Sequence, residues 1–183
     1  MNSKSQIEIN WWKHLKDTIG RDEFVKVRQA DWEDYNSHLG IDQAEGVGLD
    51  YGCGPLSILE FSGKEYDGFD PLAEEYRALS GATLFSSVPD KKYDWVLCAN
   101  VLDHDPNPEA IIQDIHDHLV DGGILFFEVH FDDRLGNPHY QIFDEQKIEE
   151  LMRGRFKLAK KEIVRYDETH QSKYWAVYKK ENK

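Results

Sequence analysis

The sequence predicts an α/β domain of three layers, in which a mostly parallel sheet of seven strands lies between two layers of helices. Short apolar runs alternate with amphipathic stretches, the arrangement typical of parallel strands joined by helical crossovers. A glycine-rich turn follows the first run. Two strand-like runs close the sequence with no helix between them, so the last strand is expected to be antiparallel. We expect residues 1–40 to form a helical lid or cap and residues 41–183 to form a single globular unit.

Composition and charge exclude several classes of protein. The 183 residues are 40% hydrophobic and 31% charged, as in a globular domain. The net charge of −13 and the lack of a basic stripe argue against nucleic acid as a partner and against binding to a membrane surface. The longest apolar stretch, GGILFF, is too short to cross a bilayer, and the N-terminus lacks the pattern of a signal peptide. Two cysteines are too few for a disulfide scaffold, so a cytoplasmic location is expected, and no feature sets an oligomeric state.

Two helices are expected near the N-terminus, over residues 8–19 and 22–38. Apolar side chains recur at helical spacing in both, and a glycine stands where each helix should end. Aromatic side chains in this segment would either close over a ligand or cover one side of the sheet; they are Trp11, Trp12, Trp32 and Tyr35.

In the rest of the chain, strands and helices alternate. Prolines open the first two crossover helices, Asn107 caps the third and Asp144 caps the fourth, which follows an irregular loop at residues 131–143. The expected helices are residues 55–63, 71–79, 107–119 and 144–152. The expected strands are residues 45–50, 65–70, 82–85, 93–100, 122–130, 156–167 and 173–180.

The stretch GLDYGCGP, residues 48–55, gives the end of the first strand an unusually bare backbone. Glycine permits a ligand to approach closely, and the helix that follows offers free N–H groups. In a parallel sheet this turn lies where the strand order reverses, which is the usual ligand crevice. Asp70 follows Asp50 by twenty residues and ends the second strand, where a carboxylate can accept hydrogen bonds from both hydroxyls of a ribose. The pattern therefore predicts a nucleoside-containing cofactor.

Two other interpretations of the turn remain open. A dinucleotide-binding turn has the pattern G-x-G-x-x-G, and here Ser57 stands at the position of the third glycine. A nicotinamide-dependent oxidoreductase is therefore the weaker alternative. The structural alternative is a tight strand-to-helix turn that binds no ligand.

Four stretches, in order, resemble the class I S-adenosylmethionine-dependent methyltransferases over about residues 46–179. VGLDYGCGP is similar to the first motif of that family and YDGFDP to the second. KKYDWVLCANVLDHDPNP resembles the fourth-strand segment, and HLVDGGILFFEV resembles the entry into the fifth strand. The closing antiparallel pair also matches. The resemblance implies the class I methyltransferase fold, S-adenosylmethionine as the cofactor and methyl transfer as the reaction.

The resemblance also implies which residues contact the cofactor. The glycine turn would lie along the methionine part, the acid after the second strand would hold the ribose, two serines would flank the adenine, and Asn100 would lie near the methionine amino group. The implied residues are Asp50, Gly52, Cys53, Gly54, Asp70, Pro71, Ser86, Ser87 and Asn100. The two serines stand where many relatives carry an acid for the adenine amino group. A non-catalytic S-adenosylmethionine-binding or regulatory module is therefore kept as an alternative.

The expected activity is methyl transfer to a small-molecule or glycan-type acceptor, preferably at oxygen. Such a reaction needs the donor and acceptor aligned, and a hydroxyl acceptor also needs a base. Candidate catalytic residues follow the fourth and fifth strands, with His104 first among them; the others are His130, His139 and Tyr140. For each, a structural or exposed side chain is the alternative. The acids of the loop lack metal-ligand spacing, so no metal is expected, and a protein acceptor remains an open alternative.

Overall fold

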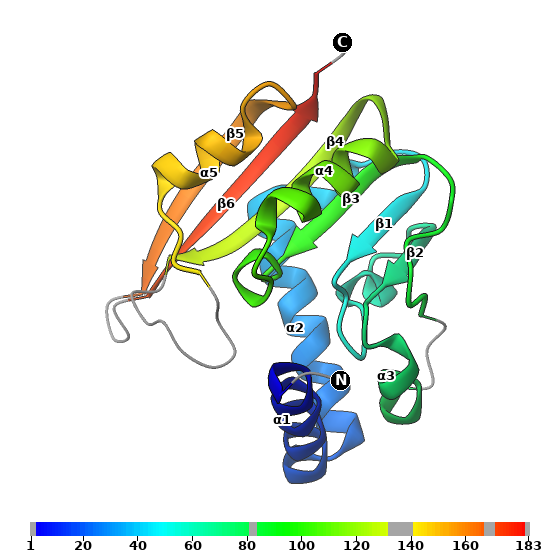
Figure 1. Ribbon diagram of the computed structural model, residues 1–183. Coiled ribbons are helices and arrows are strands. Elements are labelled where there is room, and N and C mark those ends of the chain that lie inside the picture. The colour runs from blue at the N-terminus through cyan, green and yellow to red at the C-terminus, as the bar shows by residue number, and fades with distance from the viewer. Residues whose placement is uncertain (1–2, 81–83, 132–140, 167–170, 182–183) are drawn as a thin grey trace.

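A computed structural model describes residues 3–80, 84–131, 141–166 and 171–181 of the protein. Its centre is a six-stranded sheet with the strand order β2-β1-β3-β4-β6-β5 (Figure 1). The strands are β1 (Gly48–Tyr51), β2 (Tyr66–Phe69), β3 (Tyr93–Ala99), β4 (Leu119–Phe131), β5 (Phe156–Tyr166) and β6 (Gln171–Lys180).

The directions of the strands confirm the predicted mixed sheet. β1, β2, β3 and β4 pair in parallel, and β6 pairs antiparallel with both β4 and β5. β2 lies on one side of β1 and β3 on the other, so the strand order reverses at β1. The ligand crevice of such a sheet lies beyond the carboxyl ends of the strands at this point. Asp50 of β1 stands opposite Gly68 and Leu97 there.

The prediction of a seventh strand at residues 82–85 is wrong for the part that is described. Phe85 forms one isolated parallel bridge with Phe69: its N–H donates to the Gly68 carbonyl at 2.9 Å, and its carbonyl accepts from Asp70 N–H at 3.0 Å. Leu84 is buried, but Phe85 is 38% exposed. A single buried side chain provides too little apolar surface to fix a longer strand. Residues 81–83 lie outside the described ranges.

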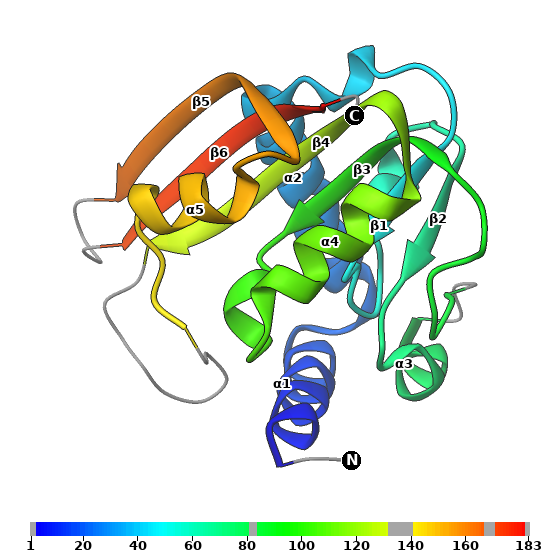
Figure 2. The same ribbon diagram turned by 45° about the horizontal axis from the view of Figure 1, so that its top comes forward.

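Helices cover both faces of the sheet, as predicted (Figures 1 and 2). α4 (Pro108–His118) and α5 (Glu145–Met152) lie on one face, and α2 (Arg21–Leu39) crosses the other. Each face has its own apolar cluster. Phe127 of β4 belongs to the cluster beneath α4 and α5, whereas Trp95 of β3 and Trp175 of β6 belong to the cluster beneath α2.

Caps fix where α4 and α5 begin, as the sequence predicts. The Asn107 side chain accepts a hydrogen bond from Ala110 N–H at 3.3 Å, and Pro108 takes the first helical position. The Asp144 side chain accepts from Lys147 N–H at 2.8 Å. Each cap satisfies a donor that the helix itself leaves unpaired.

The first crossover is tighter than the helix expected at residues 55–63. It contains only the four-residue 3-10 helix η2 (Ile58–Phe61), in which Ser57 Oγ accepts from Leu59 N–H at 3.0 Å. Ser57 caps η2 with a ψ of 135°, outside the helical range, so the helix does not extend further toward β1. The second crossover helix forms as expected and is α3 (Ala73–Ser80), and short 3-10 turns η1 (Ile41–Gln43) and η3 (Leu102–His104) complete the elements.

The two N-terminal helices are α1 (Ser3–Ile19), which begins earlier than expected, and α2. Gly40 ends α2 with a left-handed φ of 72°. Trp32 and Tyr35 pack on the sheet, as one interpretation of the aromatic side chains predicts, whereas Trp12 lies next to Gly54 of the glycine turn. That these side chains close over a ligand stays a prediction. Among the described helices, none has the length and apolar character that crossing a membrane requires.

Candidate active site

Three predicted cofactor residues lie at the same edge of the sheet. Asp50 lies in β1, Asp70 directly follows β2, and Asn100 directly follows β3. The two acids are almost fully buried, with exposed fractions of 4% and 5%. The fold thus places two carboxyl groups and an amide beside the switch point of the sheet.

Asp50 is held by the turn that follows it. Ser57 Oγ donates a hydrogen bond to Asp50 Oδ2 at 2.5 Å. Burial raises the pKa of Asp50 to about 6, and the Ser57 hydrogen bond and the charge of Arg28 offset this rise only in part. Arg28 reaches the site from α2 and donates to the Leu56 carbonyl at 3.0 Å. Neither Ser57 nor Arg28 was predicted; a hydroxyl in so short a turn after the acid is the signal that could have identified Ser57.

Asp70 joins the second strand to the glycine turn. Its Oδ2 accepts from Gly54 N–H at 3.0 Å, and its Oδ1 accepts from Leu72 N–H at 2.8 Å. Burial raises the pKa of Asp70 to about 7; the two backbone hydrogen bonds oppose the rise, and the carboxylate of Glu8 adds to it. Each carboxylate oxygen can accept a further hydrogen bond, so Asp70 is chemically suited to hold two hydroxyls.

Side chains of the protein fill the space next to both glycines of the turn. Gly52 and Gly54 have left-handed φ values of 77° and 66°. A Cβ atom on Gly52 would lie 2.5 Å from Val101 Cγ2, and one on Gly54 would lie 3.6 Å from the Trp12 ring. The close approach that the sequence predicts at this turn is therefore made here by Val101 and Trp12.

Cys53 is buried beside β2. Its N–H donates to the Phe69 carbonyl at 3.0 Å, and its buried side chain packs beside Gly68. Burial raises the pKa of the Cys53 thiol well above its usual value. Cys98, in β3, is also buried and free, so both cysteines are buried thiols, as predicted.

The other predicted cofactor residues near β2 are open to solvent. Pro71, Ser86 and Ser87 are all exposed. The two serines directly follow Phe85, whose carbonyl is bonded to the backbone of Asp70. That contact places the two serines after the residue bonded to Asp70, and their role beside the adenine stays a prediction.

Asn100 has an unusual backbone and an unsatisfied side chain. Its φ of 55° is left-handed, a conformation that asparagine tolerates better than most residues. Its N–H donates to the Glu128 carbonyl at 3.1 Å. Its Oδ1 is buried and has no hydrogen-bond partner among the described residues. A buried acceptor in this condition suits a ligand that brings an N–H group.

The two described histidine candidates lie after β3 and at the end of β4. His104 ends η3; its side chain is 23% exposed, and Nε2 lies 3.8 Å from Oδ2 of the buried Asp103. His130 Nε2 lies 3.1 Å from Glu128 Oε1. Burial lowers the pKa of His130, but the contact with Glu128 and its charge outweigh burial, so the pKa is raised. Glu128 was not predicted, although an acid within the apolar run GGILFFEV was a usable signal.

His139 and Tyr140 lie outside the described residues. Within the described ranges, no group of three histidine, cysteine or acidic side chains is placed to hold a metal ion.

Helix α1 packs against the glycine turn and α3. Ile9, which is 2% exposed, packs with Cys53 and Tyr76. Tyr76 OH donates to Glu8 Oε1 at 2.9 Å, which ties α1 to α3. Trp12 makes an edge-on contact with Phe24 of α2, with ring centroids 5.9 Å apart.

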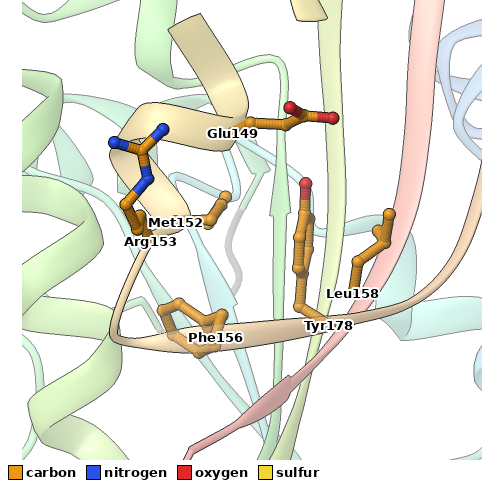
Figure 3. A pocket seen from close by; sticks show the side chains of 6 residues that line it. All are labelled: Glu149, Met152, Arg153, Phe156, Leu158 and Tyr178. Atoms are coloured by element: carbon orange, nitrogen blue, oxygen red, sulfur yellow. The ribbon is translucent and has the colours of Figure 1, made fainter. Parts of the chain in front are cut away.

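A surface pocket of about 210 Å³ lies elsewhere, between α5 and the strands β5 and β6 (Figure 3). β5 is at the opposite edge of the sheet from β2, and none of the predicted site residues lines the pocket. The lining residues are Glu149, Met152, Arg153, Phe156, Leu158 and Tyr178.

Comparisons with known proteins agree with this arrangement. Residues 24–170 match a family described as a methyltransferase domain. A curated relative, the ubiquinone biosynthesis O-methyltransferase of Pseudomonas syringae pv. tomato, is 30% identical over 89 residues. This match covers 49% of the chain but only 36% of the relative, so the chain matches little more than a third of that protein's length.

Solved structures share the fold over nearly the whole chain. The magnesium protoporphyrin IX methyltransferase of Synechocystis PCC 6803, with bound S-adenosylmethionine, has a TM-score of 0.67 at 17% identity and covers 98% of both chains. The 1,6-didemethyltoxoflavin-N1-methyltransferase of Burkholderia thailandensis, with bound S-adenosylhomocysteine, has a TM-score of 0.64 at 18% identity and covers 100% of this chain and 92% of its own. At these identities the likeness establishes the fold. With the family match over residues 24–170, it follows that the chain belongs to the class I S-adenosylmethionine-dependent methyltransferases, whose cofactor is S-adenosylmethionine.

Proposed function

We propose that the protein transfers a methyl group from S-adenosylmethionine to a hydroxyl oxygen of a small-molecule or glycan-type acceptor. The observation that carries the proposal is the meeting of Asp50, Asp70 and Asn100 at the carboxyl ends of three strands. Both acids are buried with raised pKa values, a condition that a cationic ligand relieves. S-adenosylmethionine is such a ligand, and when bound it supplies a methyl group on a sulfonium sulfur.

Two contacts of this site, those of Asp70 and Asn100, follow from chemistry already described. Asp70 keeps lone pairs for the ribose hydroxyls. The buried Oδ1 of Asn100 would accept a hydrogen bond from the ammonium group of the cofactor. The remaining proposed contacts are Asp50, Gly52, Cys53 and Gly54 along the methionine part, Pro71 beside the ribose, and Ser86 and Ser87 beside the adenine.

We place the acceptor beside η3 and the end of β4. A hydroxyl acceptor needs a base, and His104 and His130 are the described side chains at this edge that can serve. His139 and Tyr140 complete the proposed set. The name of the curated relative, an O-methyltransferase, favours oxygen as the acceptor atom. The name of one solved structure specifies N1, so the choice of oxygen is part of the proposal.

We further propose that residues 1–40 act as a lid. Trp12 lies against Gly54, and the bond from Tyr76 to Glu8 holds α1 across the nucleoside side of the crevice. A cytoplasmic location is part of the proposal, supported by two cysteines that are both free thiols.

A non-catalytic module that binds S-adenosylmethionine is the second candidate. Ser86 and Ser87 are exposed and offer no carboxylate to the adenine, and Val101 fills the space next to Gly52. Membership of the methyltransferase family sets aside the nicotinamide-dependent oxidoreductase.

Calorimetry followed by a transfer assay tests the proposal. We expect S-adenosylmethionine to bind and NAD not to bind. Methyl-labelled cofactor should then label at least one member of a panel of phenols, sugars and amines. Binding with no labelled product across the panel would favour the non-catalytic module. Failure to bind S-adenosylmethionine would contradict both candidates.

A further inference from the structure

Glu128 is a fully buried carboxylate in an otherwise apolar part of β4, with an exposed fraction of 0%. It pairs across the sheet with Trp175, and the alternation of side chains along β4 places Phe126 and His130 on the same face. A buried carboxylate is costly unless polar or charged partners surround it. Its partners therefore indicate why an acid occupies this position.

Two side chains from different elements approach the two oxygens of Glu128. Tyr35, from α2, donates its hydroxyl to Oε2 at 3.1 Å. His130 Nε2 lies 3.1 Å from Oε1. The Tyr35 ring makes an edge-on contact with Trp175 at 4.8 Å, which holds its hydroxyl in place. A connected chain of side chains therefore runs from α2 through Glu128 to His130.

Charged groups from three elements act on the imidazole of His130. Burial lowers its pKa, but the contact with Glu128 and the charge of that residue outweigh burial. Lys173, from β6, opposes the rise, and Asp103, from η3, adds to it. The net effect is a base stronger than an ordinary histidine.

We propose that Glu128, held by Tyr35, is a positioning residue that orients His130 as the general base for a hydroxyl acceptor. With the Nε2 proton directed at Glu128, Nδ1 is left to accept the proton of the hydroxyl. Nε2 lies 3.1 Å from Oε1, and we expect this contact to align in the complex with the acceptor, where catalytic hydrogen bonds tighten. This inference rests on the proposed function and deepens it, because it makes α2 part of the active site.

The bonds that break and form in the methyl transfer also indicate the class of acceptor. The hydroxyl O–H bond breaks and its proton goes to His130 Nδ1, while the oxygen electron pair forms the bond to the methyl carbon. The bond from sulfur to that carbon breaks, and sulfur keeps the electrons. The imidazolium that results stays beside the negative charge of Glu128. A weakly acidic hydroxyl such as a phenol requires this base, whereas a carboxylate acceptor does not.

Nitrogen-15 NMR of histidine-labelled protein tests the contact between Glu128 and His130 without any need for turnover. The His130 signals are assigned by their loss in His130→Asn. In the wild type we expect His130 to titrate above the usual value and to keep its proton on Nε2 when neutral. Glu128→Gln should lower that pKa by about one unit or more. Glu162→Gln is the matched control, because it changes an exposed carboxylate that contacts His38 instead, and it should leave His130 unchanged.

Two results would overturn the inference: a neutral wild-type His130 with its proton on Nδ1, or the same titration in Glu128→Gln as in the wild type. The wild-type measurement needs no substitution, so the inference can be overturned even if Glu128→Gln fails to fold.

A kinetic measurement separates the inference from the proposed function. With catechol as the probe acceptor, the wild-type kcat should rise with pH through the pKa of His130. Glu128→Gln should shift this limb to lower pH and reduce kcat on the order of 100-fold, with the KM for catechol unchanged. An unchanged kcat profile would overturn the positioning role. Absence of wild-type transfer to any acceptor would instead contradict the proposed function, while the NMR result would still decide the contact between Glu128 and His130.

Discussion

Asp70 Oδ2 accepts a hydrogen bond from the Gly54 backbone N–H at 3.0 Å, so the acid after β2 and the turn after β1 form one unit. This contact lies where the strand order reverses. A change at either residue therefore affects both the ribose side and the methionine side of the proposed cofactor site.

Asp70→Ala should abolish detectable binding of S-adenosylmethionine while the domain stays folded. The substitution leaves two backbone donors unpaired, at a cost of about 1–3 kcal/mol for each, but it also removes a buried carboxyl whose pKa is raised. Calorimetry and circular dichroism measure the two effects. Asp90→Ala, at an exposed position, is the control. Normal affinity in Asp70→Ala would show that the ribose assignment is wrong.

Binding of S-adenosylmethionine should release protons from the protein at about pH 6.5. Burial raises the pKa of Asp50 to about 6 and that of Asp70 to about 7. A bound cation favours the ionised carboxylates and lowers both pKa values, so affinity should rise with pH and level off above the pKa of Asp70. Titrations in buffers with different heats of ionisation measure the release. Proton uptake, or no dependence on the buffer, would contradict the account.

Asp50→Asn removes one of the two titrating carboxyl groups. For Asp50 the free energy of unfolding depends on pH in the direction opposite to the affinity, because it falls as pH rises. Between the ordinary value of 3.8 and about 6, the folded Asp50 holds a proton that the unfolded chain has released. The wild type therefore loses stability as pH rises through this window, by about 3 kcal/mol at most. Urea unfolding should show Asp50→Asn gaining stability over the wild type at pH 8 but not at pH 4, together with reduced proton release on binding. Equal differences at both pH values would argue against a raised pKa.

Gly52→Ala should lower stability more than Gly63→Ala does. Both glycines have left-handed backbones, with φ values of 77° and 67°, so both variants carry backbone strain of about 1–3 kcal/mol. A Cβ on Gly52 would also collide with Val101, whereas one on Gly63 meets nothing within 4 Å. The collision adds about 1–3 kcal/mol. Urea unfolding measures both variants, and equal losses would show that Val101 does not pack against Gly52.

Trp12→Ala should speed both association and dissociation of S-adenosylmethionine in stopped-flow measurements. Trp12 packs against Gly54 and Phe24, so its loss loosens α1 over the crevice. Trp11→Ala is a close control, because Trp11 is the neighbouring residue and is 53% exposed. The lid proposal fails if the two variants have the same rates.

Local signals in the sequence were sufficient for much of the fold. Asn107 and Asp144 were identified as caps because their short side chains pair with helix donors wherever such a helix begins. The closing strand pair was predictable because no helix lies between the two runs. The prediction of a strand at residues 82–85 was wrong because the sequence of a short apolar run does not show how many of its side chains will be buried. Of its described side chains, Leu84 is buried but Phe85 is not.

The candidate site was predictable only in part. Asp50, Asp70 and Asn100 follow from their positions at strand ends, because parallel topology brings those ends together. The contact between Tyr35 and Glu128 joins residues 93 positions apart, and it depends on how α2 packs across the sheet. No local pattern encodes that packing. The filling of the space at Gly52 by Val101 likewise depends on tertiary structure.

A crystal structure of the protein soaked with S-adenosylhomocysteine tests the central claim most directly. We predict density for the ribose at Asp70 and for the amino group at Asn100 Oδ1, with Val101 displaced from Gly52. An empty crevice at high ligand concentration, with Val101 still packed on Gly52, would contradict it.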